Sequence, residues 1–178
     1  MNINELYLES VKKRFLDYKS LGEKAMDQLD TELLFKAPNA DSNSIGVIVK
    51  HLWGNMLSRW TNFLTEDGEK SWRERDAEFE ESIFERAELM AKWDEGWKCL
   101  FDTLDSLKPE QLADIIKIRG EEHTVMDAIN RQLAHYPYHI GQIVYAAKML
   151  KDGGFKSLTI PKGQSNQFNT GMFGDEKK

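Results

Sequence analysis

Apolar residues recur at alternating steps of three and four along four long stretches of the chain, and this period constrains the fold more than any other feature. A period near 3.6 residues predicts an amphipathic helix that buries one side. In the first stretch the period places seven residues on one helical face: Leu8, Val11, Phe15, Tyr18, Gly22, Ala25 and Leu29. We therefore predict a first helix that ends before the loop-forming segment KAPNADSNS, residues 36–44.

The second and third stretches repeat this pattern. The second helix is predicted to begin at a cap provided by Asn43 or Ser44, and its apolar stripe continues to Phe63. The third stretch covers residues 82–107, and Pro109 closes it because a proline cannot donate to the helical ladder. Both stretches therefore predict helices with one buried face.

The fourth helix is predicted from the Thr124 cap to Lys151, just before two glycines. Ahead of it, residues 115–123 (IIKIRGEEH) predict a short extended segment or a hairpin. The tail, residues 155–178, is rich in Gly, Asn, Gln and Lys and is expected to be irregular. Because no linker or repeat divides the chain, we predict a single all-α domain over residues 1–178, built as a four-helix bundle.

Charge and composition exclude several classes of protein. The net charge is −6 and no dense basic stretch is present, so a nucleic-acid partner is not expected. No run of about 18 apolar residues predicts a membrane span. The single cysteine, Cys99, cannot form an intrachain disulfide and fits the reducing cytoplasm, and its place near the apolar stripe predicts packing rather than nucleophilic chemistry.

Two histidines lie four residues apart in the fourth predicted helix. Positions i and i+4 are separated by about 40° around a helix, so His135 and His139 project from one edge, beside the apolar stripe. His51 lies on the corresponding flank of the second predicted helix. Three neutral imidazoles suit zinc or nickel, and they also coordinate ferrous iron. Asn55 and Gln142 are predicted to accept the second ring N–H of these histidines.

Other interpretations of these histidines remain open. An H-x3-H pair also arises by chance on helices, and Pro137 removes a helical hydrogen bond and can kink the axis between the pair. His123 precedes the Thr124 cap and is expected to lie outside the site. Tyr136 follows the first histidine where a zinc peptidase needs a glutamate, so a metalloprotease is not predicted.

The segment RQLAHYPYHIGQIVYAAK, preceded by IKIRGEEHTVMDAI and paired with VIVKHLWGN, resembles the DinB/YfiT-like superfamily of bacterial four-helix bundles. The tail segment SLTIPKGQSNQFN is similar to the signature of one uncharacterised branch of that superfamily. The resemblance implies a divalent metal ion, nickel or zinc, bound by His51, His135 and His139.

The resemblance also implies a function, because some relatives are thiol-dependent transferases or isomerases that use mycothiol, bacillithiol or glutathione-like cofactors. We expect a cytoplasmic, metal-dependent S-transferase that joins a low-molecular-weight thiol to an electrophile. Arg131 would hold a carboxylate of the thiol, or it is a solvated surface arginine. The alternatives are a non-enzymatic metal-binding or stress-associated protein that forms a dimer, and a metal-free helical interaction module.

The aromatic content bears on assembly. Five tryptophans exceed what a small bundle core easily accommodates: Trp53, Trp60, Trp72, Trp93 and Trp97. Trp93 and Trp97 are predicted to fill the core, and others are expected to line the crevice or a subunit interface. We expect a homodimer, and the tryptophans outside the core are candidates for its interface.

Overall fold

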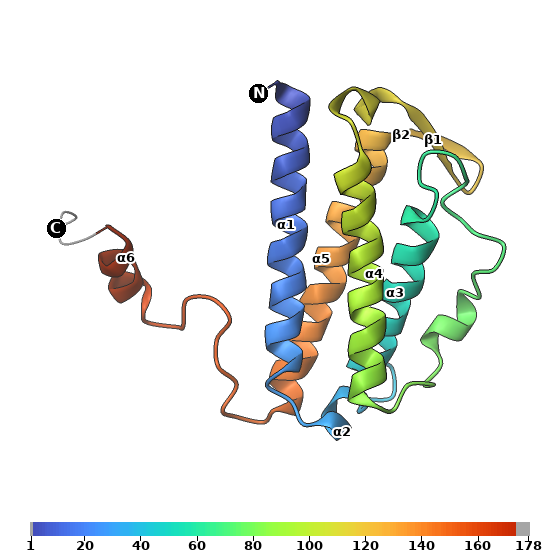
Figure 1. Cartoon of the computed structure of the whole chain (residues 1–178). Helices are drawn as coiled ribbons and strands as arrows, with labels where there is room; N and C mark the ends of the chain where they lie inside the picture. Colours follow the sequence, from blue (N-terminus) through green and yellow to red (C-terminus); the bar gives the residue numbers. More distant parts are fainter. Residues whose placement is uncertain (1, 174–178) are drawn as a thin grey trace.

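The computed structural model describes residues 2–173, which are mostly helical with one two-stranded sheet. Four long helices lie side by side (Figure 1): α1 (Ile3–Met26), α3 (Ile45–Trp60), α4 (Arg86–Ser106) and α5 (Val125–Leu150). Three short helices lie in the connections: α2 (Thr31–Leu34), η1 (Asp76–Phe79) and η2 (Pro109–Ala113). The helix α1 packs mainly on α5, and α4 packs mainly on α3, while α3 also contacts α5. The predicted all-α class broadly fits this mostly helical structure, which adds one small sheet.

Side-chain caps set the starts of three long helices. Asn2 caps α1, Ser44 caps α3 and Thr124 caps α5, each by accepting the backbone N–H three residues further along. These bonds satisfy donors that have no partner within the helix. Of the two residues predicted to cap the second helix, the structure therefore selects Ser44 over Asn43.

The second helix ends earlier than its apolar stripe predicts. α3 stops at Trp60, because Thr61 takes an extended backbone with ψ of 125° and Asn62 has a φ of 50°. A positive φ does not continue a right-handed helix. Phe63 still packs its ring against Trp60, with centroids 4.9 Å apart, so the apolar period outlasts the helix. The third helix likewise begins at Arg86 rather than at residue 82.

A β-hairpin precedes α5. Strands β1 (Ile115–Ile118) and β2 (Glu121–Thr124) pair antiparallel, with Ile118 opposite Glu121. The two turn residues, Arg119 and Gly120, have φ values of 57° and 78°. Two central residues with positive φ are the conformation that a tight two-residue hairpin turn requires. The hairpin alternative for residues 115–123 is therefore confirmed.

Residues 61–85 connect α3 to α4 through a short 3-10 helix, η1 (Asp76–Phe79). Lys50 on α3 donates to the carbonyl of Ala77 at 2.5 Å. The carboxylate of Asp67 accepts the two backbone N–H groups of the hairpin turn, at 2.8 and 2.7 Å. These bonds hold the connection against α3 and the hairpin.

A cluster of aromatic rings forms the centre of the core. Phe15, Trp97 and Tyr136 lie with ring centroids 5.8–6.4 Å apart. The indole N–H of Trp60 donates to the Tyr136 hydroxyl at 2.9 Å, and this hydroxyl donates to Asn55 at 3.2 Å. The core thus contains a buried hydrogen-bonded chain that fixes the facing sides of α3 and α5.

The tryptophans divide between core and surface. Trp93 is 2% exposed and Trp97 is fully buried, which confirms the prediction that both fill the core. Trp60 is buried with them, whereas Trp72 in the connection is 54% exposed.

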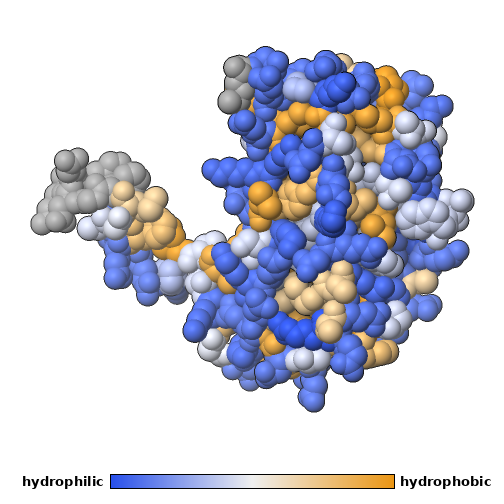
Figure 2. Space-filling view, viewed as in Figure 1, coloured by the Kyte–Doolittle hydropathy of each residue, from blue (hydrophilic) through white to orange (hydrophobic). Residues whose placement is uncertain are grey.

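The tail leaves the body of the molecule after α5 (Figure 2). The prediction that residues 155–178 form an irregular tail is partly wrong, because α6 (Ser165–Phe173) is helical. This helix is held by local hydrogen bonds, such as the one from the Phe168 N–H to the Gln164 carbonyl. Because it does not pack a face against the core, its sequence shows no apolar period that would predict it. Residues 174–178 lie outside the described part. Within residues 2–173, no helix has the length and apolar character needed to cross a membrane.

Candidate metal centre

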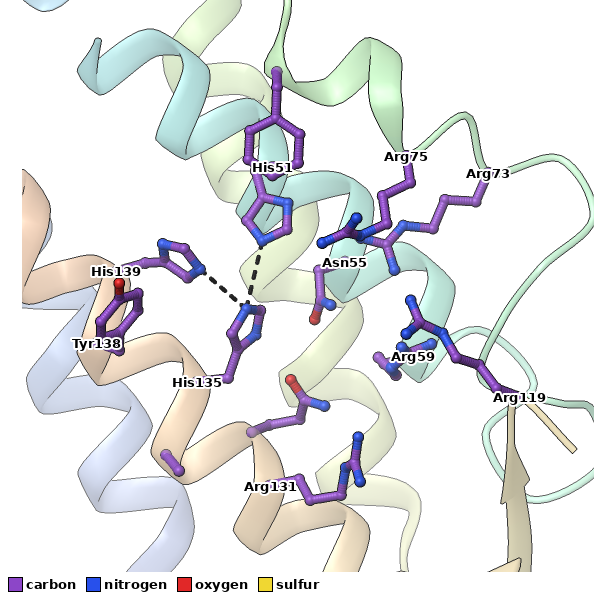
Figure 3. Close-up of a pocket in the computed structure, with 13 residues that line it drawn as sticks. His51, Asn55, Arg59, Arg73, Arg75, Arg119, Arg131, His135, Tyr138 and His139 are labelled. Carbon is purple, nitrogen blue, oxygen red and sulfur yellow. Dashed lines mark hydrogen bonds between the residues drawn. The ribbon is translucent and has the colours of Figure 1, made fainter. Parts of the chain in front are cut away.

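Three histidine side chains converge between α3 and α5 (Figure 3). His51 comes from α3, and His135 and His139 come from successive turns of α5. The Nε2 atom of His135 lies 3.4 Å from Nε2 of His51 and 3.0 Å from Nε2 of His139. All three ligand atoms lie within 4.8 Å of one another. The structure therefore brings together the three residues that the sequence selects.

Two of the three separations can be compared with those around a tetrahedral ion. Zinc–imidazole bonds of about 2.0–2.1 Å put neighbouring tetrahedral nitrogens roughly 3.3–3.4 Å apart. The two Nε2 separations at His135, 3.4 and 3.0 Å, are close to this value. The three-histidine group could therefore hold a metal ion.

The hydrogen bonds on the far side of two rings set their tautomers. Nδ1 of His51 lies 2.8 Å from Oε2 of Glu78, and Nδ1 of His139 lies 2.7 Å from Oε1 of Gln142. Both partners are acceptors, so each Nδ1 carries the proton and each Nε2 keeps its lone pair. Both lone pairs face Nε2 of His135, which has at most one proton to donate. Such a convergence of lone pairs suits a cation.

Burial keeps the α5 histidines neutral. It lowers the pKa of His135 to about 3, and the neighbouring His139 and His51 add to the shift. Burial also lowers the pKa of His139, although the hydrogen bond with Gln142 opposes this. Both rings are therefore unprotonated at neutral pH, the state in which imidazole binds a metal ion.

Glu78 is the residue that sequence reasoning missed. Its side chain is 7% exposed, and its carboxylate also accepts from Nε of Arg73 at 2.7 Å and from Nη2 of Arg73 at 2.9 Å. Burial raises the pKa of Glu78, but the bonds from His51 and Arg73 outweigh burial and hold that pKa below its usual range. Gly54 allows this approach, because a Cβ there would lie 2.9 Å from the carboxyl carbon of Glu78.

Asn55 has a different partner from the one predicted. It was expected to accept from a metal-binding histidine, but its Oδ1 accepts the hydroxyl of Tyr136 at 3.2 Å. The acceptor for His51 is Glu78, which the connection after α3 brings to the far side of the ring. Asn55 still lines the cavity beside the histidines (Figure 3).

Pro137 does not interrupt α5, which runs from Val125 to Leu150 as one helix. The kink that was considered for this position does not separate the pair, since His135 and His139 on either side of Pro137 keep their Nε2 atoms 3.0 Å apart.

The histidines open onto a cavity of about 690 Å³. At the wall of this cavity the ring of Phe79 stacks on the ring of His51, with ring centroids 4.8 Å apart. Arg131, the candidate for holding a carboxylate of the thiol or else a solvated surface arginine, lines the cavity from α5. Four further arginines, none of them singled out from the sequence, line it as well: Arg59, Arg73, Arg75 and Arg119.

Two other residues lie outside the cluster, as the sequence predicts. His123 is on β2, where its Nδ1 pairs with Asp127 at 2.7 Å. Cys99 is half-buried on α4, and burial raises the pKa of its thiol. Neither side chain lines the cavity.

Comparison with known proteins gives one match. No curated protein and no solved structure matches the chain. A family model described as "Protein of unknown function (DUF1572)" matches residues 2–164, which include all three histidines and Glu78. The chain therefore belongs to the DUF1572 family of proteins of unknown function.

Proposed function

We propose that this protein is a divalent-metal-dependent enzyme in which His51, His135 and His139 bind one zinc or nickel ion. The observation that carries the proposal is the convergence of three Nε2 atoms at the edge of an open cavity. Three protein ligands leave a fourth coordination position for a substrate, as in catalytic rather than structural zinc sites.

We further propose that the reaction is thiol S-transfer. A divalent ion held by His51, His135 and His139 would supply positive charge that lowers the pKa of a nearby thiol, which favours the thiolate at neutral pH. The thiol proton leaves to solvent, the sulfur bonds to an electrophilic carbon, and the leaving group departs from that carbon. Arg131 is available to hold a carboxylate of the thiol, because guanidinium pairs with carboxylates through two parallel bonds.

Similarity of sequence supports this assignment. The segments around the three histidines resemble DinB/YfiT-like proteins, and we propose that the four long helices are a four-helix bundle of that type in a cytoplasmic protein. We also propose a homodimer, for which the exposed rings of Trp72 and Tyr145 offer apolar surface.

Elemental analysis of untagged protein tests the metal site. One equivalent of zinc or nickel is expected, and His51→Ala and His135→Ala are expected to lose it. His123→Ala is the matched control, because this histidine lies outside the cluster, and it should retain the metal. Absence of metal from the wild-type protein after it is offered zinc and nickel would contradict the proposal.

Activity is tested with the metal-loaded protein, a panel of thiols that includes bacillithiol and glutathione, and monochlorobimane as the electrophile. Formation of the thioether with loss of chloride is expected, and His51→Ala should abolish it. Tight metal binding without turnover across the panel would favour the alternative of a non-enzymatic metal-binding protein.

A further inference from the structure

The cavity beside the histidines has an unusual concentration of positive charge. Its five arginines come from α3, the connection after it, the hairpin turn and α5: Arg59, Arg73, Arg75, Arg119 and Arg131. Figure 3 shows these side chains around the part of the cavity away from His139. Segments distant in sequence thus place their guanidinium groups around one space.

Few carboxylates balance this charge. In the described residues, the ion pairs of the five arginines reach only Glu69 and Glu78. Glu69 is shared, since its Oε2 lies 3.2 Å from Arg59 and 3.0 Å from Arg119. The crowding of positive charge affects Arg59. Burial lowers the pKa of its guanidinium, and the charges on Arg73 and Arg119 lower that pKa further, while Glu69 raises it.

Three of the arginines have capacity for a ligand. Within residues 2–173, Arg75 and Arg131 form no ion pair, and both are exposed to the cavity. Arg75 lies over the ring of Phe79, 5.7 Å from its centroid. The Arg73 side chain is only 2% exposed, and its Nη1 has no hydrogen-bond acceptor, although it lies 3.7 Å from Oε2 of Glu69. Buried donors are nearly always hydrogen-bonded, so this long ion pair leaves Nη1 with capacity for a nearer acceptor that a ligand brings.

The arginines are tied to the histidine cluster. Glu78 bonds both His51 and Arg73, so a single carboxylate separates the metal ligand from the guanidinium. Phe79 contacts both His51 and Arg75. A group held by Arg73 and Arg75 therefore lies next to the histidine cluster.

We propose that the cavity binds a small molecule with at least two oxyanion groups, held by Arg75 and Arg131 with Arg73 behind them. The inference extends the proposed function by naming the charge of the substrate. Carboxylate and phosphate share the chemistry that an arginine fork recognises, through paired N–H donors and opposite charge. Five guanidinium groups share two carboxylates, so electrostatics favour a ligand with more than one negative charge.

Calorimetric titration of the untagged, zinc-loaded full chain at low ionic strength tests the proposal. Succinate serves as the dicarboxylate probe, and glycerol phosphate serves as the phosphate probe. The variants are Arg75→Gln, Arg131→Gln and the two combined. Arg14→Gln on α1 is the matched control, because it removes the same charge from an exposed pair with Asp17 that does not line the cavity.

At least one probe is expected to bind wild-type protein, and the tighter one identifies the oxyanion. Each cavity variant should weaken binding about tenfold, since a hydrogen bond from a charged group is lost. The control should leave binding unchanged, and added salt should weaken wild-type binding more than that of the double variant. Failure of both probes to bind, or equal effects of Arg14→Gln and the cavity variants, would overturn the proposal.

The same samples separate this inference from the metal proposal. Metal content is measured in every variant, and the titration is repeated with His135→Ala protein. Arginine-dependent binding of a probe to wild-type protein that takes up neither zinc nor nickel would leave the anion site standing and remove the metal proposal, whereas binding to metal-free His135→Ala protein would show that the anion site forms without the metal. Bound metal without binding of either probe would leave the metal proposal standing and remove the anion site.

Discussion

Replacing Glu78 with glutamine should weaken metal binding without touching a metal ligand. Oε2 of Glu78 accepts from both Nδ1 of His51 and Nη2 of Arg73, while Oε1 accepts from Nε of Arg73. An amide keeps only one oxygen, so its NH₂ group must face either Arg73 or His51. In both orientations the negative charge behind the His51 ring is lost.

The size of the effect follows from these contacts. Removing the partner of a metal-binding histidine typically lowers metal affinity 10–100-fold, which corresponds to about 1.4–2.8 kcal/mol. Glu78→Gln retains the volume of the side chain, so we expect a zinc dissociation constant raised within this range. The metal-free protein should also lose about 1–3 kcal/mol of unfolding free energy, because Arg73 stays buried with a weaker acceptor.

The assay is competition for zinc against a chromophoric chelator at neutral pH. Circular dichroism first establishes that the variant is folded at the temperature of the titration. Glu66→Gln is the matched control: it removes a carboxylate from the same connection, where the side chain is 51% exposed and pairs with Lys70. Zinc affinity of folded Glu78→Gln equal to that of wild type would refute the role assigned to Glu78.

Three further outcomes are expected. Gly54→Ala should weaken zinc binding in the same assay, because its Cβ would displace the Glu78 carboxylate from His51. Tyr136→Phe should lower the unfolding free energy in urea by about 1–3 kcal/mol, because the buried Trp60 N–H loses its acceptor. In metal-free protein, urea stability should fall as the pH is lowered from about 6.5 towards 3, because the unfolded state binds the proton that folded His135 excludes. His135→Gln should reduce this pH dependence, and an unchanged dependence would contradict the assignment.

The four long helices could be predicted because each buries one continuous face. Such a face produces an apolar period, and the period marked α1, α3, α4 and α5, although α1 ends at Met26, well before the loop predicted at residues 36–44. The apolar period failed as a guide where a buried residue lies outside a helix and where a helix lies outside the core. Phe63 is buried beyond the end of α3, and α6 is helical without packing that would impose a period.

The histidine cluster was predictable for a related reason, and its surroundings were not. The i, i+4 spacing of His135 and His139 fixes their common direction, and the flank of His51 can be computed from the same helical geometry. Glu78 lies 27 residues after His51, in a connection that has no periodic apolar pattern. The sequence therefore does not predict that the Glu78 side chain contacts the His51 ring. The arginines are likewise scattered along the chain, and only the packing of the hairpin and the connection on α3 brings them together.

Glu78 also explains how a cation site and an arginine-lined cavity can adjoin. A divalent ion next to Arg73 would be repelled, and imidazoles, being neutral, would not reduce that repulsion. The Glu78 carboxylate lies between the His51 ring and Arg73, so it neutralises the nearest guanidinium and polarises the ring towards the metal position. With three neutral ligands, a bound ion would keep its full charge towards the cavity. The ion and two arginines that form no ion pair within residues 2–173, Arg75 and Arg131, would then favour the same kind of occupant, an anion with several oxyanion groups.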